Sequence, residues 1–179
     1  MRLETDNPTI ADIRSRRSIR RFTGEPVEDE AVRAVLDSGR WAPSGLNNQP
    51  CRFLVVKGAD PRREKIAPLT KYSSLIRSAD VLIAVFIDNS ASYNTLRDHQ
   101  AAGAAIQNML LAAHSLGLGA VWIGQIANRA EEVVSALDLS EKNLSLVAVV
   151  AMGHPAESPD PVRHPLTHFL LEDFTCPSL

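Results

Sequence analysis

The sequence predicts a fold in which helices cover both faces of a central β-sheet. Segments with helical periodicity alternate along the chain with short apolar runs of the kind that form buried strands. The apolar runs cover residues 53–56, 81–87, 120–123 and 144–152. The chain has 179 residues, with no internal repeat, low-complexity run or linker. We therefore expect one domain, residues 1–179, that is long enough to bury a core.

The longest helical pattern lies in residues 98–124, and we expect the rest of the fold to be arranged around it. Its polar residues recur seven positions apart, which leaves a thin polar stripe on an apolar helix. These residues are Gln100, Gln107 and His114. Residues 101–105 are all alanine or glycine, and Gly117 suits the left-handed cap that ends a helix. The pattern predicts a helix buried nearly all round, partly by a second copy of the chain. The polar residues argue against a membrane span, which needs about 20 apolar residues.

The remaining helices are predicted from capping signals. A side-chain oxygen before a helix can accept hydrogen bonds from its first N–H groups, and acidic residues suit the positive end of the helix dipole. In chain order, the signals are Thr9 with Asp12, Pro26 with Glu28 and Asp29, Asp60 with Pro61, and Asn128 with Glu131 and Glu132. The turn-rich sequence RWAPSGLNNQP occupies residues 40–50, and a proline-rich exit follows Gly153.

The composition excludes several classes of protein. Charged residues make up 22% of the chain and the net charge is −2, so there is no general attraction to nucleic acid or to an anionic membrane. Cys51 and Cys176 are too few for a disulfide framework, and the five histidines lack metal-ligand spacing. No Ser-His-Asp order or nucleophile elbow is present. The start of the chain has no apolar signal-peptide region, so we expect a cytoplasmic protein.

Four segments contain residues that could bind a cofactor. The first, residues 14–22, reads RSRRSIRRF and can present several charge-assisted donors to one anion. A small phosphorylated ligand suits this compact patch, and a solvated surface or a nucleic-acid contact are the alternatives. The second, residues 42–50, is either an ordinary polar turn or a loop that lines a cofactor. The third is Gly124 with Gln125, after a buried strand, and the fourth is Arg163, in the proline-rich exit.

Taken in this order, the four segments resemble the motifs of the nitroreductase superfamily. The matching stretches are residues 16–22, 42–50, 103–124 and 153–157, with Arg163. The resemblance spans about residues 10–171 and implies an α+β sandwich, in which helices cover both faces of a central mixed sheet. It also implies an interlocked homodimer with one flavin mononucleotide (FMN) at each end of the subunit interface, and it places the central helix at the dimer seam.

The resemblance assigns roles to the basic residues. Arg16, Arg17 and Ser18 would bind the phosphate and ribityl region of FMN, and Arg163 would return to the phosphate. Arg20 would lie near the pyrimidine edge of the flavin ring. A fixed guanidinium there would stabilise the negative charge of the reduced flavin.

The resemblance also places a loop and two peptide groups beside the ring. The loop residues would come from the other subunit and are Pro43, Ser44 and Gly45, with Asn47 and Gln49 in the same motif. The N–H groups of Gly124 and Gln125 would face the ring nitrogen that receives hydride. Two positions depart from the family: Cys51 stands where tryptophan often follows Gln-Pro, and Gly124-Gln125 stands where many members have an acidic residue followed by glycine.

The function implied is that of an FMN-dependent oxidoreductase. NADH or NADPH would reduce the flavin and leave, and a small organic oxidant of the nitroaromatic or quinone type would replace it in a ping-pong cycle. The flavin carries out the hydride chemistry, so no side-chain acid or base is assigned and Arg20 has an electrostatic role only. Dehalogenation, flavin fragmentation and flavin binding without turnover are the alternatives. No nucleic-acid, membrane or metal partner is expected.

Overall fold

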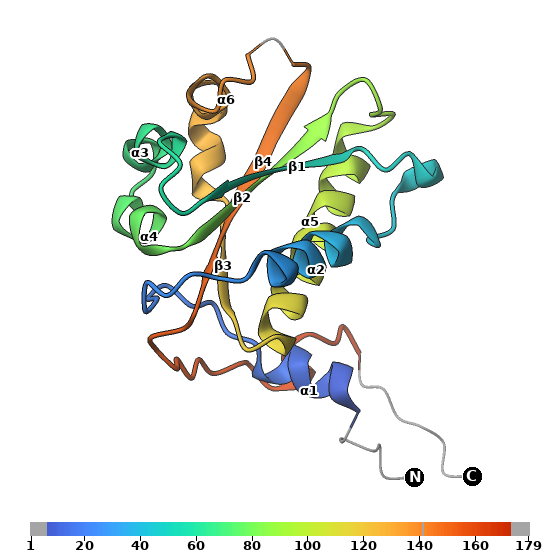
Figure 1. Ribbon diagram of the computed structural model, residues 1–179. Helices are drawn as coiled ribbons and strands as arrows, with labels where there is room; N and C mark the ends of the chain where they lie inside the picture. Colours follow the sequence, from blue (N-terminus) through green and yellow to red (C-terminus); the bar gives the residue numbers. More distant parts are fainter. Residues whose placement is uncertain (1–6, 141, 173–179) are drawn as a thin grey trace, which may run out of the picture.

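A four-stranded sheet with the strand order β1-β2-β4-β3 forms the centre of the molecule (Figure 1). The computed structural model describes residues 7–140 and 142–172, so Cys176 lies outside the described residues. The strands are β1 (Cys51–Lys57), β2 (Val81–Asp88), β3 (Gly119–Ile123) and β4 (Leu144–Gly153). Each neighbouring pair is antiparallel, so the prediction of a mixed sheet is wrong for these four strands. Apolar runs indicate burial but contain no information on strand direction. The one parallel pairing in the described chain is an isolated bridge between Ser18 and Ala120.

Helices cover both faces of the sheet, as predicted (Figure 1). One face carries α2 (Asp29–Arg40) and α5 (Thr95–Ser115), and the other carries α3 (Arg62–Ile66), α4 (Ser73–Ser78) and α6 (Ala130–Ala136). The apolar core is divided in the same way. Ile83 and Met109 belong to the cluster under α2 and α5, whereas Phe86 and Ile76 belong to the cluster under the three shorter helices.

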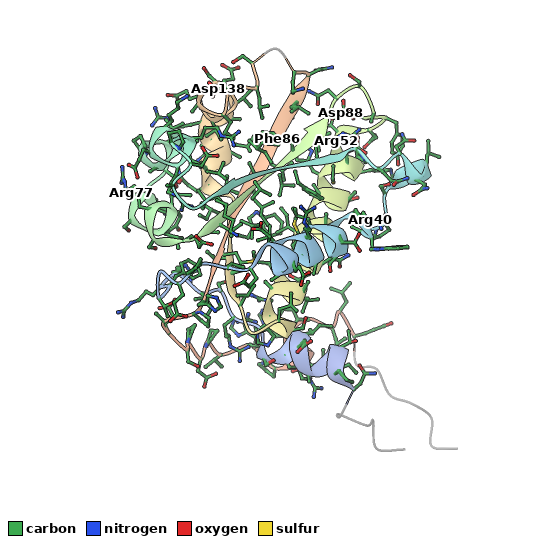
Figure 2. All side chains as sticks on the ribbon, in the orientation of Figure 1. Arg40, Arg52, Arg77, Phe86, Asp88 and Asp138 are labelled. Atoms are coloured by element: carbon green, nitrogen blue, oxygen red, sulfur yellow. The ribbon has the colours of Figure 1, made fainter. Side chains whose placement is uncertain are left out.

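The central strand β2 explains this division. Its residues from Val81 to Ile87 are all buried, and successive side chains of a strand point to opposite faces. The strand therefore contributes to both clusters, with Phe86 among the largest fully buried side chains (Figure 2). At the end of the strand, Asp88 accepts a hydrogen bond of 2.9 Å from Arg52 of the edge strand β1, and the two side chains lie together at this end of the sheet (Figure 2).

Helix α5 is buried on one side within a single chain. Ala102, Ile106 and Met109 are fully buried, but Ala104 and Leu111 on the other side are only half-buried. The prediction of a helix buried nearly all round included cover from a second copy of the chain, and a single copy buries only one side of α5. Its predicted end is confirmed. Gly117 has a φ of 74°, and the N–H of Leu118 folds back to the carbonyl of Ala113 at 2.8 Å. In the part of the chain that the structure describes, no helix is long and apolar enough to cross a bilayer.

The helix starts correct some of the capping predictions. The first helix, α1 (Pro8–Ser15), is capped by Asn7, whose side chain accepts from the N–H groups of Thr9 and Ile10, so Thr9 is not the cap. Asp60 accepts from the N–H of Arg62 at 2.9 Å, as expected for the start of α3. Helix α2 begins at Asp29, three residues after Pro26.

The start of α6 also differs from the prediction. Asn128 lies inside a 3₁₀ turn, Gln125–Arg129, and α6 begins at Ala130, so Asn128 is not its cap. The acidic residues Glu131 and Glu132 do occupy the first turn. A capping signal in the sequence identifies a residue type that can end a helix, but the neighbouring turn decides which residue does so.

Candidate functional site

The arginine segment that follows α1 is held between strand β3 and the chain that leaves β4. The N–H of Ile19 donates to the carbonyl of Ala120 at 3.1 Å. On the other side, the N–H of Thr23 donates to the carbonyl of His154 at 3.0 Å, and the N–H of Ala156 donates to the carbonyl of Arg21 at 2.9 Å. Figure 1 shows the two segments, blue and red-brown, side by side. The segment is therefore a fixed part of the fold rather than a free basic arm.

The close approach to β3 depends on a glycine. A methyl group at Gly119 would lie 2.7 Å from Cγ2 of Ile19 and 2.8 Å from its Cβ, both of which are too short for carbon–carbon contact. Ile19 is buried, so it cannot move aside into solvent. A β-carbon is thus excluded at position 119, and the arginine residues on either side of Ile19 are held against the end of the sheet.

Five of the predicted residues line one cavity of about 480 Å³, which we call the basic cavity. They are Arg16, Arg17, Ser18, Arg20 and Arg163. The acidic residue of this cavity, Asp160, lies 3.6 Å from Arg17, but its side chain is 97% exposed and neutralises little of the charge. Several charged donors of the protein can therefore bind one anion in this cavity.

Arg16 has hydrogen-bond donors that the described chain leaves unsatisfied, and it lines this cavity. Its Nε and Nη1 atoms are buried, and neither has a hydrogen-bond partner in the described chain. Burial lowers the pKa of Arg16, and the nearby charges of Arg163 and Arg17 lower it further. An anion bound close to these two nitrogen atoms would accept from their N–H groups and offset the repulsion among the three guanidinium groups. The donor set thus fits a phosphate group such as that of FMN.

Arg20 and Arg17 are positioned by backbone contacts. The backbone N–H of Arg20 donates to Glu157 Oε1 at 2.6 Å, and its guanidinium donates to the carbonyl of Ser18 at 3.3 Å. The Arg17 guanidinium donates to the carbonyl of Arg14 at 2.6 Å. Arg20 remains exposed, so its charge can reach beyond the cavity.

The second predicted segment, residues 42–50, forms a loop that contains a short 3₁₀ turn, Gly45–Asn47. Leu46, Asn47 and Gln49 all have positive φ, between 49° and 55°, which is costly for residues other than glycine. The loop is held by Ser44, whose hydroxyl accepts from the N–H of Gln49 at 3.0 Å. Such strain is typical of functional loops, and here it presents the Leu46 side chain to solvent at 80% exposure.

This loop borders a different cavity, of about 390 Å³, which we call the loop cavity. Pro43, Ser44 and Gln49 line it, together with Cys51, whose pKa is raised by burial. Gly45 and Asn47 lie outside it. A methyl group at Gly45 would lie 2.5 Å from Cζ of Tyr93, so the phenol ring packs directly on the loop backbone.

The third predicted pair, Gly124 and Gln125, lies just after β3 and lines neither cavity. The first N–H groups of such a turn have no acceptor within it and can serve an external group. The Gln125 side chain accepts a hydrogen bond of 2.7 Å from the hydroxyl of Thr70. The sequence contains no signal for Thr70, which lies 55 positions away.

One chain therefore brings together only part of the predicted site. The basic cavity unites two segments that are distant in sequence, but the loop cavity shares no lining residue with it. The predicted residues at 43–49 and those at 16–20 are thus separate in a single copy.

Comparison with known proteins identifies the class to which this fold and site belong. The nitroreductase family model matches residues 13–72 and 60–154. A solved nitroreductase structure in complex with FMN, from Desulfovibrio desulfuricans, is 55% identical with a TM-score of 0.93, covering 96% of this chain and 100% of that chain. The NADPH-flavin oxidoreductase of Vibrio harveyi is 32% identical over 166 residues, which cover 86% of this chain and 68% of that protein.

A further relative is found in an archaeon. A Methanothermobacter thermautotrophicus protein with the name NADH dehydrogenase/NAD(P)H nitroreductase is 36% identical over 149 residues, covering 82% of this chain and 77% of that protein. The chain belongs to the nitroreductase family. The expectations of an α+β fold and of this family are confirmed.

Proposed function

We propose that this protein is an NAD(P)H-dependent FMN oxidoreductase that reduces a small organic oxidant of the nitroaromatic or quinone type. The observation that carries the proposal is Arg16, which has two buried nitrogen atoms without hydrogen-bond partners and lines a cavity together with three further arginine residues. The names of the relatives, which include an NADPH-flavin oxidoreductase and an oxygen-insensitive NADPH nitroreductase, support it.

The basic cavity is the place for the phosphate end of FMN. Arg16, Arg17 and Ser18 would bind the phosphate and ribityl chain together with Arg163. Arg20 would face the pyrimidine edge of the ring, and the N–H groups at 124–125 would face the ring nitrogen. These assignments follow the family motif, and the cluster of donors around Arg16 supports the first of them.

A homodimer would complete the site. Because the loop cavity and the basic cavity are separate within one chain, Pro43, Ser44 and Gly45 would reach the flavin from the second copy, with Asn47 and Gln49 in the same loop. The half-buried side of α5 and exposed apolar side chains on three helices support such a pairing. The exposed side chains are Ile13 on α1, Trp41 at the end of α2 and Leu116 at the end of α5.

Bound FMN would supply the hydride chemistry, taking a hydride from NADH or NADPH and passing it to the oxidant in a ping-pong cycle. The chain supplies binding, orientation and electrostatics. The Arg20 guanidinium would stabilise negative charge at the pyrimidine edge, and the N–H donors at 124–125 would stabilise it at the ring nitrogen. No side-chain acid or base is needed. We place the protein in the cytoplasm, without a nucleic-acid or membrane partner.

The visible spectrum of the freshly purified protein tests the proposal. We expect bound FMN, identified by the mass of the released cofactor, and bleaching of its absorption by NADH or NADPH. A colourless protein that also fails to bind added FMN would refute the proposal, and flavin that neither nucleotide reduces would indicate binding without turnover. Reaction products with nitroaromatic, quinone and halogenated aromatic substrates separate the reductase from a dehalogenase.

Arg20→Ala tests the role of one residue. We expect this change to slow flavin reduction more than it weakens flavin retention, because the guanidinium acts on the charge that develops during reduction. Equal losses in both would make Arg20 a binding contact only.

A further inference from the structure

Thr70 and Gln125 form a hydrogen bond that joins two distant parts of the chain beside the proposed flavin site. Thr70 lies between a 3₁₀ turn, Ala67–Leu69, and helix α4, and it is one of the few buried polar residues, at 7% exposure. Its Oγ1 lies 2.7 Å from Oε1 of Gln125. The same Oγ1 accepts from the N–H of Tyr72 at 3.3 Å. A buried hydroxyl is thus used fully, as acceptor and as donor.

These two contacts determine which way the Gln125 carboxamide is turned. The Tyr72 N–H can only donate to Thr70, so the hydroxyl proton of Thr70 is available to Gln125. A carboxamide accepts at its oxygen and donates at its nitrogen, so holding Oε1 on Thr70 turns the NH₂ group the other way. Gln125 is half-buried, and its NH₂ group donates no hydrogen bond within residues 7–140 and 142–172. It is an oriented donor that the protein itself does not use.

We propose that Thr70 is a positioning residue, which holds the Gln125 carboxamide so that its NH₂ group donates to the flavin bound beside Gly124. The inference rests on the proposed function. A neutral hydrogen-bond donor beside the flavin ring favours the more negative, reduced form of the flavin. The Thr70–Gln125 pair therefore raises the reduction potential of the bound flavin.

The two-electron reduction potential of the bound FMN, measured by equilibration with a reference dye, tests this assignment. We expect Thr70→Val and Gln125→Met each to lower the potential by about 30 mV, which corresponds to a tenfold change in the equilibrium of a two-electron couple. The double variant should show no further decrease, because both changes remove the same donor. Thr70→Ser keeps the hydroxyl and should keep the wild-type potential. The dissociation constant of FMN, from titration of the flavin-free protein, should change less than tenfold.

Three outcomes would overturn the assignment. An unchanged potential in Gln125→Met does so even if Thr70→Val fails to fold, because that variant leaves the buried threonine in place. Equal shifts in Thr70→Ser and Thr70→Val would give Thr70 a packing role only. A wild-type protein that binds no FMN refutes the proposed function as well, whereas flavin-loaded variants with the wild-type potential refute this inference alone.

Discussion

Arg16→Met should make the ligand-free protein more stable and at the same time impair anion binding. Methionine has a shorter, unbranched and apolar side chain, and it lacks the two buried nitrogen atoms that Arg16 leaves without partners. A buried unpaired polar group costs about 1–3 kcal/mol. Because each kcal/mol shifts the melting temperature of a chain of this size by about 2–4 °C, we expect an increase of several degrees in the absence of FMN.

The loss of binding should be larger than the gain in stability. Two charge-assisted hydrogen bonds to a phosphate contribute about 1.5–3 kcal/mol each, so their removal should raise the dissociation constant of FMN by about 10²- to 10⁴-fold. Thermal unfolding of the flavin-free protein measures the first effect, and fluorescence titration with FMN measures the second. Inorganic phosphate is a second probe, since it tests the cavity without the flavin ring.

Arg14→Met is the matched control, because it removes the same charge from an exposed position on α1 outside the basic cavity. We expect it to leave FMN affinity within about twofold of the wild type, as is usual for a solvated charge. The reasoning would be refuted if Arg16→Met lowered the melting temperature of the flavin-free protein, or if both variants lost affinity equally. Equal losses would mean that net charge, rather than the buried donors of Arg16, controls binding.

Three further predictions concern the scaffold. Arg63 is buried and donates to the carbonyls of four residues. Arg63→Met should therefore lower the free energy of unfolding, measured by urea denaturation, by about 3 kcal/mol. A change below about 1 kcal/mol would contradict a stabilising role for these hydrogen bonds. Gly119→Ala should weaken FMN binding at least tenfold by displacing Ile19, and the double variant with Ile19→Ala should recover affinity if the clash is the cause. Hydrogen bonding from Arg62 lowers the pKa of Asp60 from 3.8 to about 2. The stability that Asp60 contributes is therefore present above the unfolded pKa and is lost as the pH falls from about 4 to 2. Asp60→Asn should flatten the pH dependence of the free energy of unfolding in that range. An unchanged slope would exclude the Asp60–Arg62 ion pair as the source of this pH dependence.

Much of the fold could be predicted because burial leaves a local pattern in the sequence. All four strands were expected within three residues of their observed ends, since apolar runs mark strands that are covered on both faces. The end of α5 was equally clear, because Gly117 tolerates the positive φ that the cap requires. Helix starts were less reliable. Asn7 and Thr9 both can cap a helix, and the local turn geometry selects between them.

The candidate site was predictable as residue types but not as a geometry. The cluster of arginine residues in the segment after α1 is visible in the sequence, and its order relative to the other motifs indicates the family. Two nitrogen atoms of Arg16 are buried without partners because the chain after β4 returns to this segment. The division between the basic cavity and the loop cavity likewise depends on how α2, α5 and the sheet pack.

The sequence by itself determined the elements, their two-sided burial and the basic character of the site, because these properties depend on the spacing of residues within one segment. Only the tertiary structure decided the antiparallel order of the strands and the burial of two Arg16 nitrogen atoms without partners. It alone also placed Thr70 against Gln125 across 55 positions. Contacts of this kind form when long loops close and two surfaces pack, and the stability of that packing belongs to the whole chain rather than to either segment.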